Sequence, residues 1–105
     1  MSQSTPTITV DRLAERQADG TLIDVREGNE YVQAHIPGAR LVPMGELPAR
    51  VDELDRTRPV WVVCASGNRS QAMTDLLCAR GFEAYSVADG TRDWMTSGRP
   101  VERGL

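Results

Sequence analysis

Short apolar runs alternate along this chain with longer segments in which apolar residues recur every three or four positions. A short apolar run predicts a strand, and the wider spacing predicts a helix with one buried face. We therefore expect strands at residues 7–10, 21–25, 39–43, 60–63 and 83–87, and helices at residues 12–18, 28–35, 46–56, 70–80 and 91–97. Strands that alternate with helices are typical of an α/β domain with a mostly parallel sheet.

The residues that flank these segments predict where the helices begin and end. Asp11 is a favourable N-cap for the first helix, because its carboxylate can accept a backbone N–H that lacks a partner. Pro37 disfavours helical backbone at Ile36 and so ends the second helix. Gly20 and Gly81 follow the first and fourth helices, where glycine ends a helix readily.

The segment VWVV at residues 60–63 is apolar throughout, without the alternation of a half-buried strand. This pattern predicts a central strand that is covered on both faces, as in a parallel sheet. Functional crevices in such sheets lie outside the carboxyl ends of the strands. Cys64 occupies that position, so its thiol is the first candidate for chemistry.

The loop after this strand combines small residues with one glycine and one cation. Gly67 permits a turn that a side chain would block, and Ser70 can cap the helix that follows. If the loop is tight, its backbone N–H groups point inward and form an anion-binding nest beside the positive end of that helix. The candidate binding residues are those of the loop itself: Ala65, Ser66, Gly67, Asn68, Arg69 and Ser70.

Two interpretations of Cys64 follow from this context. Cysteine is among the most buried residue types, and a lone cysteine beside an apolar strand is usually a small hydrophobic residue of the core. In an anion-binding loop, however, the thiolate is stabilised, and the thiolate is the nucleophilic form. Arg69 adds a fixed cation that can pair with an oxyanion. The residues therefore favour a nucleophilic cysteine in a small anion cradle.

Three motifs in this sequence resemble those of the rhodanese family. CASGNRS at residues 64–70 is similar to the active-site loop C-x-x-G-x-R-S of that family. LIDVREGNEYVQAHIPGA at residues 22–39 resembles its N-terminal signature, and GFEAYSVADGTRDWMTSGRPV at residues 81–101 resembles its C-terminal signature. The three motifs stand in the order found in the family and cover most of the chain.

The resemblance implies a rhodanese-like three-layer α/β domain, with a central, mostly parallel five-stranded sheet flanked by helices. It also implies a thiosulfate-type sulfurtransferase. The Cys64 thiolate would attack the outer sulfur of thiosulfate, release sulfite and become a persulfide, and cyanide, a cellular thiol or a protein acceptor would then remove that sulfur. The loop N–H groups and Arg69 would hold the anionic donor, and no metal or organic cofactor would be required.

Two positions depart from the family pattern. Many single-domain relatives carry arginine immediately after the cysteine, where this chain has Ala65, so a cation is missing from the cradle. Asp89 and Gly90 stand where the family usually has two glycines, which adds a negative charge at that turn. The missing cation keeps a second function open, a sulfur-relay or binding module with little thiosulfate turnover. An oxyanion enzyme for arsenate or phosphate ranks lowest, because such enzymes use C-x5-R, and only four residues separate Cys64 from Arg69 here.

Four further side chains have a structural interpretation beside a functional one. Asp24 and Arg26 follow the second strand and could contact substrate, but an ion pair that ties neighbouring loops is the favoured interpretation. His35 stands just before a Pro-Gly turn, where we expect it to stabilise the turn rather than act as a base. Cys78 would lie about 12 Å from the loop along the helical rise, so we expect core packing rather than a resolving thiol.

Composition and charge exclude several other classes. With 40% hydrophobic and 26% charged residues, the chain matches an ordinary soluble globular protein, and we treat residues 1–105 as a single domain with loose ends. A net charge of −3 without a basic stripe argues against a nucleic-acid partner. No apolar run approaches the length of a membrane span, and the N-terminus lacks the features of a signal peptide. We therefore expect a cytoplasmic protein with two free thiols.

Overall fold

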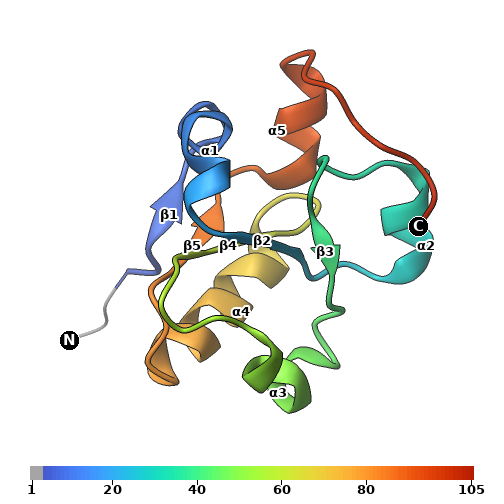
Figure 1. Ribbon diagram of the computed structural model, residues 1–105. Coiled ribbons are helices and arrows are strands. Elements are labelled where there is room, and N and C mark those ends of the chain that lie inside the picture. The colour runs from blue at the N-terminus through green and yellow to red at the C-terminus, as the bar shows by residue number, and fades with distance from the viewer. Residues whose placement is uncertain (1–3) are drawn as a thin grey trace.

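The computed structural model describes residues 4–105 and contains a five-stranded sheet with helices on both faces (Figure 1). The strands are β1 (Thr7–Ile8), β2 (Thr21–Asp24), β3 (Arg40–Leu41), β4 (Val60–Val63) and β5 (Ala84–Val87). Their order across the sheet is β1-β5-β4-β2-β3, and every neighbouring pair is parallel. The expected α/β fold with a five-stranded sheet is confirmed, and the sheet is parallel throughout.

Among residues 4–105, α-helices connect the strands and cover the sheet. They are α1 (Val10–Arg16), α2 (Gly28–Gln33), α3 (Leu47–Arg50), α4 (Asn68–Ala79) and α5 (Gly90–Thr96). The helices α3 and α4 lie below the sheet in Figure 1, and α1 and α5 lie above it. In this described part of the chain, every helix is too short or too polar to cross a bilayer.

Alternate side chains of β4 contribute to two separate apolar cores. Val62 belongs to a buried cluster that includes Leu77 of α4. Trp61 belongs to a second buried cluster, which includes Leu13 of α1 and Trp94 of α5. All four residues of β4 are buried, which confirms the prediction of a central strand covered on both faces. The result is a three-layer arrangement of helices, sheet and helices.

The first and fourth helices begin at different residues from those expected. Thr9, and not Asp11, is the N-cap of α1, because its hydroxyl oxygen accepts the backbone N–H of Arg12 at 3.1 Å. The first strand is therefore shortened to two residues, since the chain already turns into the helix at its cap. The helix α4 begins at Asn68, before the expected start, because Gly67 turns the chain with a φ of 112°.

The third helix is shorter than expected. It ends at Arg50, and a 3-10 turn follows at Val51–Glu53. Val51 and Leu54 are both buried. Val51 belongs to this turn and Leu54 follows it, and their three-residue spacing lets both side chains pack into the same core cluster.

The segment that joins β5 to α5 approaches the loop after β4 closely. The Cys64 carbonyl accepts the N–H of Thr91 at 2.9 Å, and the Ala65 carbonyl accepts that of Arg92 at 3.1 Å. A Cβ at Gly90 would overlap the Cys64 carbonyl oxygen and would lie 2.7 Å from that of Ala65. Glycine at this position therefore allows α5 to dock against the loop.

We expect Gly90→Ala to destabilise the protein more than Gly98→Ala does. Both glycines have positive φ, 58° and 81°, so alanine costs about 1 kcal/mol at either position through backbone strain. Only at Gly90 would the new Cβ also meet the loop, since nothing lies within 4 Å of a Cβ at Gly98. Urea unfolding should therefore show a further loss of about 1–3 kcal/mol at Gly90. Equal losses would show that the close approach does not matter.

Candidate active site

The loop after β4 wraps around the sulfur of Cys64. The backbone N–H of Gly67 donates to Sγ at 3.1 Å, and that of Ser70 donates at 3.3 Å. Cys64 is 1% exposed, so these donors take the place of water around its sulfur. The inward-pointing N–H groups expected for the loop are present.

A pair of buried hydroxyl groups lies behind the sulfur. The thiol of Cys64 donates to Oγ of Ser70 at 3.4 Å, and the Oγ atoms of Ser70 and Ser86 share a hydrogen bond of 2.7 Å. When the thiol is ionised, the Ser70 hydroxyl can turn its hydrogen toward the sulfur and accept a hydrogen from Ser86. No sequence pattern identifies Ser86 as part of the site. The one feature that could have indicated it is a small hydroxyl side chain in a mostly apolar strand.

These hydrogen bonds change the acidity of the thiol. Burial alone would raise the pKa of Cys64, because a buried thiolate loses its solvation. The Ser70 hydroxyl and the backbone amides of Ser70, Gly67 and Ser66 outweigh that effect and hold the pKa below its ordinary value. A lower pKa increases the fraction of thiolate near neutral pH, and the thiolate is the nucleophile.

Arg69 forms an ion pair with Glu30 of α2 instead of presenting a free cation to the cradle. Its guanidinium donates to the two carboxylate oxygens at 2.7 and 2.9 Å. Glu30 also accepts the backbone N–H of Glu27 at 3.1 Å and so helps to cap α2. The hydrogen bonds from Arg69 are the main cause that lowers the pKa of Glu30 to about 2. The pair is therefore charged at every physiological pH.

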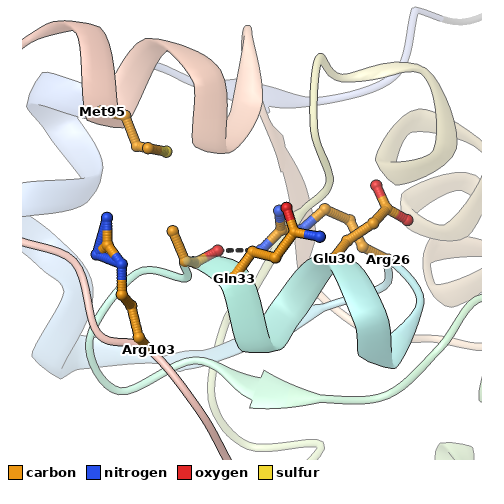
Figure 2. A pocket seen from close by; sticks show the side chains of 6 residues that line it. Arg26, Glu30, Gln33, Met95 and Arg103 are labelled. Atoms are coloured by element: carbon orange, nitrogen blue, oxygen red, sulfur yellow. Dashed lines mark hydrogen bonds between the residues drawn. The ribbon is translucent and has the colours of Figure 1, made fainter.

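A pocket of about 390 Å³ lies between α2, α5 and the C-terminal segment, beside this ion pair. Figure 2 shows Glu30 and Arg26 at one end of the pocket, with Gln33 farther along α2 and Met95 and Arg103 across from it. The pocket adjoins the candidate site through Glu30, whose partner belongs to the loop.

Asp24 and Arg26 form a buried ion pair, as the sequence led us to expect. The Arg26 guanidinium donates to Oδ2 of Asp24 at 2.8 Å and to the Ala34 carbonyl at 2.8 Å, which joins the ends of β2 and α2. His35 stacks on Tyr31 with the ring centroids 3.7 Å apart, and its Nδ1 lies 2.8 Å from the Tyr31 carbonyl oxygen. These contacts give the ion pair and the histidine structural roles.

Cys78 lies on the exposed side of α4, so the expectation of core packing is wrong. The buried side of this helix carries Met73 and Leu77. Cys78 follows Leu77 directly and is turned about 100° away from it around the helix axis. Both cysteines are free thiols, as expected.

The remaining residues of the loop have different surroundings. Ser66 directs its backbone amide at the sulfur, whereas Asn68 is exposed at the first position of α4. Ala65 contributes its carbonyl to the contact with α5. Asp89 lines a hollow together with Ser66, so the negative charge noted in the sequence lies beside the candidate site.

Comparison with known proteins connects this loop and this fold to one family. The family model of the rhodanese-like domain matches residues 9–97. The chain belongs to this family. The rhodanese-like domain described here is also similar to the structure of a rhodanese-related protein from Thermoplasma volcanium, with a TM-score of 0.88, 32% identity, and coverage of 91% of this chain and 96% of that one. The resemblance seen in the sequence is therefore confirmed.

Two curated relatives of the rhodanese-like domain carry names that refer to sulfur chemistry. YrkF of Bacillus subtilis (strain 168), named as a candidate sulfur carrier protein, is 35% identical over 97 residues, which are 89% of this chain and 52% of that protein. The thiosulfate sulfurtransferase GlpE of Actinobacillus pleuropneumoniae serotype 3 (strain JL03) is 35% identical over 83 residues, which are 78% of this chain and 77% of that protein. The chain spans about half the length of YrkF and of one further relative.

In this rhodanese-like domain, Ser70→Ala should raise the pKa of Cys64, because it removes the hydroxyl that opposes the effect of burial. Alkylation by iodoacetamide at pH 7 should become about two- to tenfold slower. A Cys78→Ser background lets the measurement report Cys64 alone, since Cys78 is exposed and would also react. Ser86→Ala should change the pH profile in the same direction, but less. An unchanged profile for Ser70→Ala would contradict the role of its hydroxyl.

Glu30→Gln should destabilise the rhodanese-like domain by about 1 kcal/mol at pH 7, after allowance for the partial exposure of the ion pair. The pKa of Glu30 is about 2 in the folded chain, against an ordinary value of 4.5. Its carboxylate therefore stabilises the fold above about pH 4.5 and loses this effect as the pH falls toward 2. The difference between wild type and Glu30→Gln in urea unfolding should shrink over that range. A difference that persists at about pH 2 would assign the effect to the α2 cap instead.

Proposed function

We propose that this chain is a sulfurtransferase that carries a sulfane sulfur on Cys64 as a persulfide. The observation that carries the proposal is the set of hydrogen bonds to Sγ, in which the N–H groups of Gly67 and Ser70 donate at 3.1 and 3.3 Å. They favour a thiolate although the residue is buried. The central strand β4 aims this nucleophile, and membership of the rhodanese-like family supports sulfur transfer.

Thiosulfate is the first donor to consider for this cradle. The Cys64 thiolate attacks the outer sulfur of thiosulfate, a new S–S bond forms, and the original S–S bond breaks with its electron pair leaving on sulfite. The amides of Ser66, Gly67 and Ser70 are the N–H groups available to stabilise the anionic sulfur. Cyanide or a thiolate then attacks the outer sulfur and returns Cys64 as a thiolate. Neither step needs a cofactor or a redox partner.

A sulfur-relay module is the second candidate, and the charge around the loop favours it. Ala65 brings no cation, and Glu30 already neutralises the guanidinium of Arg69. Thiosulfate is a dianion, so this loop attracts it less than a loop with free cations would. In the relay, a persulfide donor loads Cys64 and a protein accepts the sulfur, which agrees with the name of the sulfur carrier relative.

An enzyme for arsenate or phosphate esters remains the lowest-ranked candidate. Four residues separate Cys64 from Arg69, and Arg69 is held by Glu30 at 2.7 Å rather than left free for an oxyanion. We place the proposed reaction in the cytoplasm, where thiols stay reduced and serve as acceptors. The negative net charge supports a small anion or a protein as partner rather than nucleic acid or a membrane.

Thiosulfate should add one sulfur atom to the wild-type chain, and cyanide should remove it. Intact-mass spectrometry before and after each reagent checks this outcome. Cys64→Ser should gain no sulfur, because it lacks the nucleophile. Cys78→Ser is the matched control and should behave like wild type, which separates the two free thiols.

The choice of donor distinguishes the two leading candidates. Wild type that stays unmodified with thiosulfate, yet gains sulfur from a persulfide donor, would favour the relay. Failure to gain sulfur from either donor would contradict both forms of the proposal.

A further inference from the structure

A second hollow, of about 210 Å³, lies against the cradle where α5 begins. Its lining residues are Ser66, Asp89, Arg92, Asp93 and Thr96. The backbone of α5 is fixed to the loop here, because the Ala65 carbonyl accepts the N–H of Arg92 at 3.1 Å. Ser66 belongs to both places, since it follows Cys64 by two positions and also lines the hollow. A molecule bound in the hollow would therefore lie next to the nucleophilic loop.

The hollow contains one cation and two carboxylates that are not paired with one another. Arg92 is exposed, and within residues 4–105 its guanidinium takes part in no hydrogen bond or ion pair. The carboxylates of Asp89 and Asp93 also lack a side-chain partner in that part of the chain. In contrast, Arg69 on the loop is already bound to Glu30. The hollow therefore brings unpaired charges of both signs next to the cradle.

We propose that this hollow binds the amino-acid end of a zwitterionic thiol, such as cysteine or its persulfide. Arg92 holds the carboxylate of that molecule, and Asp89 and Asp93 hold its ammonium group. The proposal rests on the proposed function and deepens it, since it names the class of thiol that exchanges sulfur with Cys64. The size permits this, because a hollow of about 210 Å³ is several times the roughly 30 Å³ that one water molecule occupies, so it has room for a small amino acid.

The mixture of charges selects a zwitterion over a simple ion. A dianion such as thiosulfate is attracted by Arg92 but repelled by the carboxylates of Asp89 and Asp93 in the same hollow. A thiol with only an ammonium group leaves the guanidinium without a partner and is repelled by it. A molecule that carries both groups pairs with all three side chains, so charge complementarity favours it.

The exchange of sulfur balances without a further reagent. The thiol of the bound amino acid loses its proton to water, and its thiolate attacks the outer sulfur of the Cys64 persulfide. A bond forms between these two sulfurs, the bond from the outer sulfur to Sγ breaks, and its electron pair returns to Sγ. The products are the Cys64 thiolate and an amino-acid persulfide. The reverse reaction loads Cys64 from such a persulfide.

S-methylcysteine tests the binding site separately from the reaction, because it keeps both charged groups and has no thiol. In an NMR titration, wild type should show saturable shifts at the amides of Ser66 and Arg92, and Arg92→Ala should bind about three- to tenfold more weakly. Arg103→Ala is the matched control and should bind like wild type, since Arg103 is another exposed arginine but lines the pocket between α2 and α5 (Figure 2). No saturable shift in wild type, or an equal loss in both variants, would overturn the assignment.

Transfer rates test which groups of the thiol are recognised. Cys64 is first loaded with sulfur, and its loss to cysteine, cysteamine or N-acetylcysteine is followed by intact mass. Cysteamine lacks the carboxylate, so Arg92→Ala should leave its rate within about twofold while slowing cysteine about three- to tenfold. N-acetylcysteine lacks the ammonium group, so the double variant Asp89→Asn, Asp93→Asn should slow cysteine but not N-acetylcysteine. For each thiol, the rate with the variant is divided by the rate with wild type, so the intrinsic reactivity of the thiol cancels.

The two measurements separate this inference from the proposed function. If S-methylcysteine binds at Arg92 but Cys64 never gains sulfur, the binding site is supported and the sulfurtransferase proposal fails. If Cys64 exchanges sulfur but Arg92→Ala slows all three thiols equally, the sulfurtransferase proposal is supported and the zwitterion site is overturned.

Discussion

The chemistry of this site depends on stabilising a thiolate whose sulfur is largely shielded from water. Cys64 is 1% exposed, and burial alone disfavours its ionised form. N–H and O–H dipoles replace the missing solvent: they come from the amides of Ser66, Gly67 and Ser70 and from the Ser70 hydroxyl. The fold serves this arrangement, because β4 fixes the backbone before the sulfur, Gly67 turns the chain around it, and α4 begins where the turn ends.

Segments far apart in the sequence hold these dipoles in position. Ser86 of β5 supports the Ser70 hydroxyl from behind at 2.7 Å. Gly90 lets α5 approach the loop backbone closely, and Glu30 ties Arg69 to α2. The loop is therefore held by β5, α5 and α2. Dipoles that are fixed in advance do not have to reorganise when charge develops on the sulfur.

The range of each contact along the chain explains which features were predictable. The apolar run of β4 and the glycine of the loop act within a few residues, so the parallel sheet and the place of the nucleophile could be predicted from the sequence. Ser86 and Glu30 act on partners 16 and 39 residues away, and no local pattern marks them. Arg69 is a further case of a distant partner. Its guanidinium looks free in the sequence, but in the fold it forms an ion pair with Glu30 of α2. Cys78 is exposed although its neighbour Leu77 is buried, because one step along a helix turns the side chain by about 100° and a pattern of spacings does not fix the buried side to within one residue.

The position of β4 in the sheet has a consequence for how such a protein changes over evolutionary time. β4 is hydrogen-bonded to β2 on one side and to β5 on the other, so its amides lie inside the ladder and not at an edge. Amides in core strands are among the last to exchange with solvent, because the opening that exposes them costs a free energy close to that of global unfolding. The sulfur therefore follows the strand that we expect to resist local unfolding most. The helices α2 and α5, in contrast, flank the loop from the periphery (Figure 1). Substitutions at positions of these two helices that do not contact the loop can change which molecules the domain binds, while the reacting sulfur stays in place.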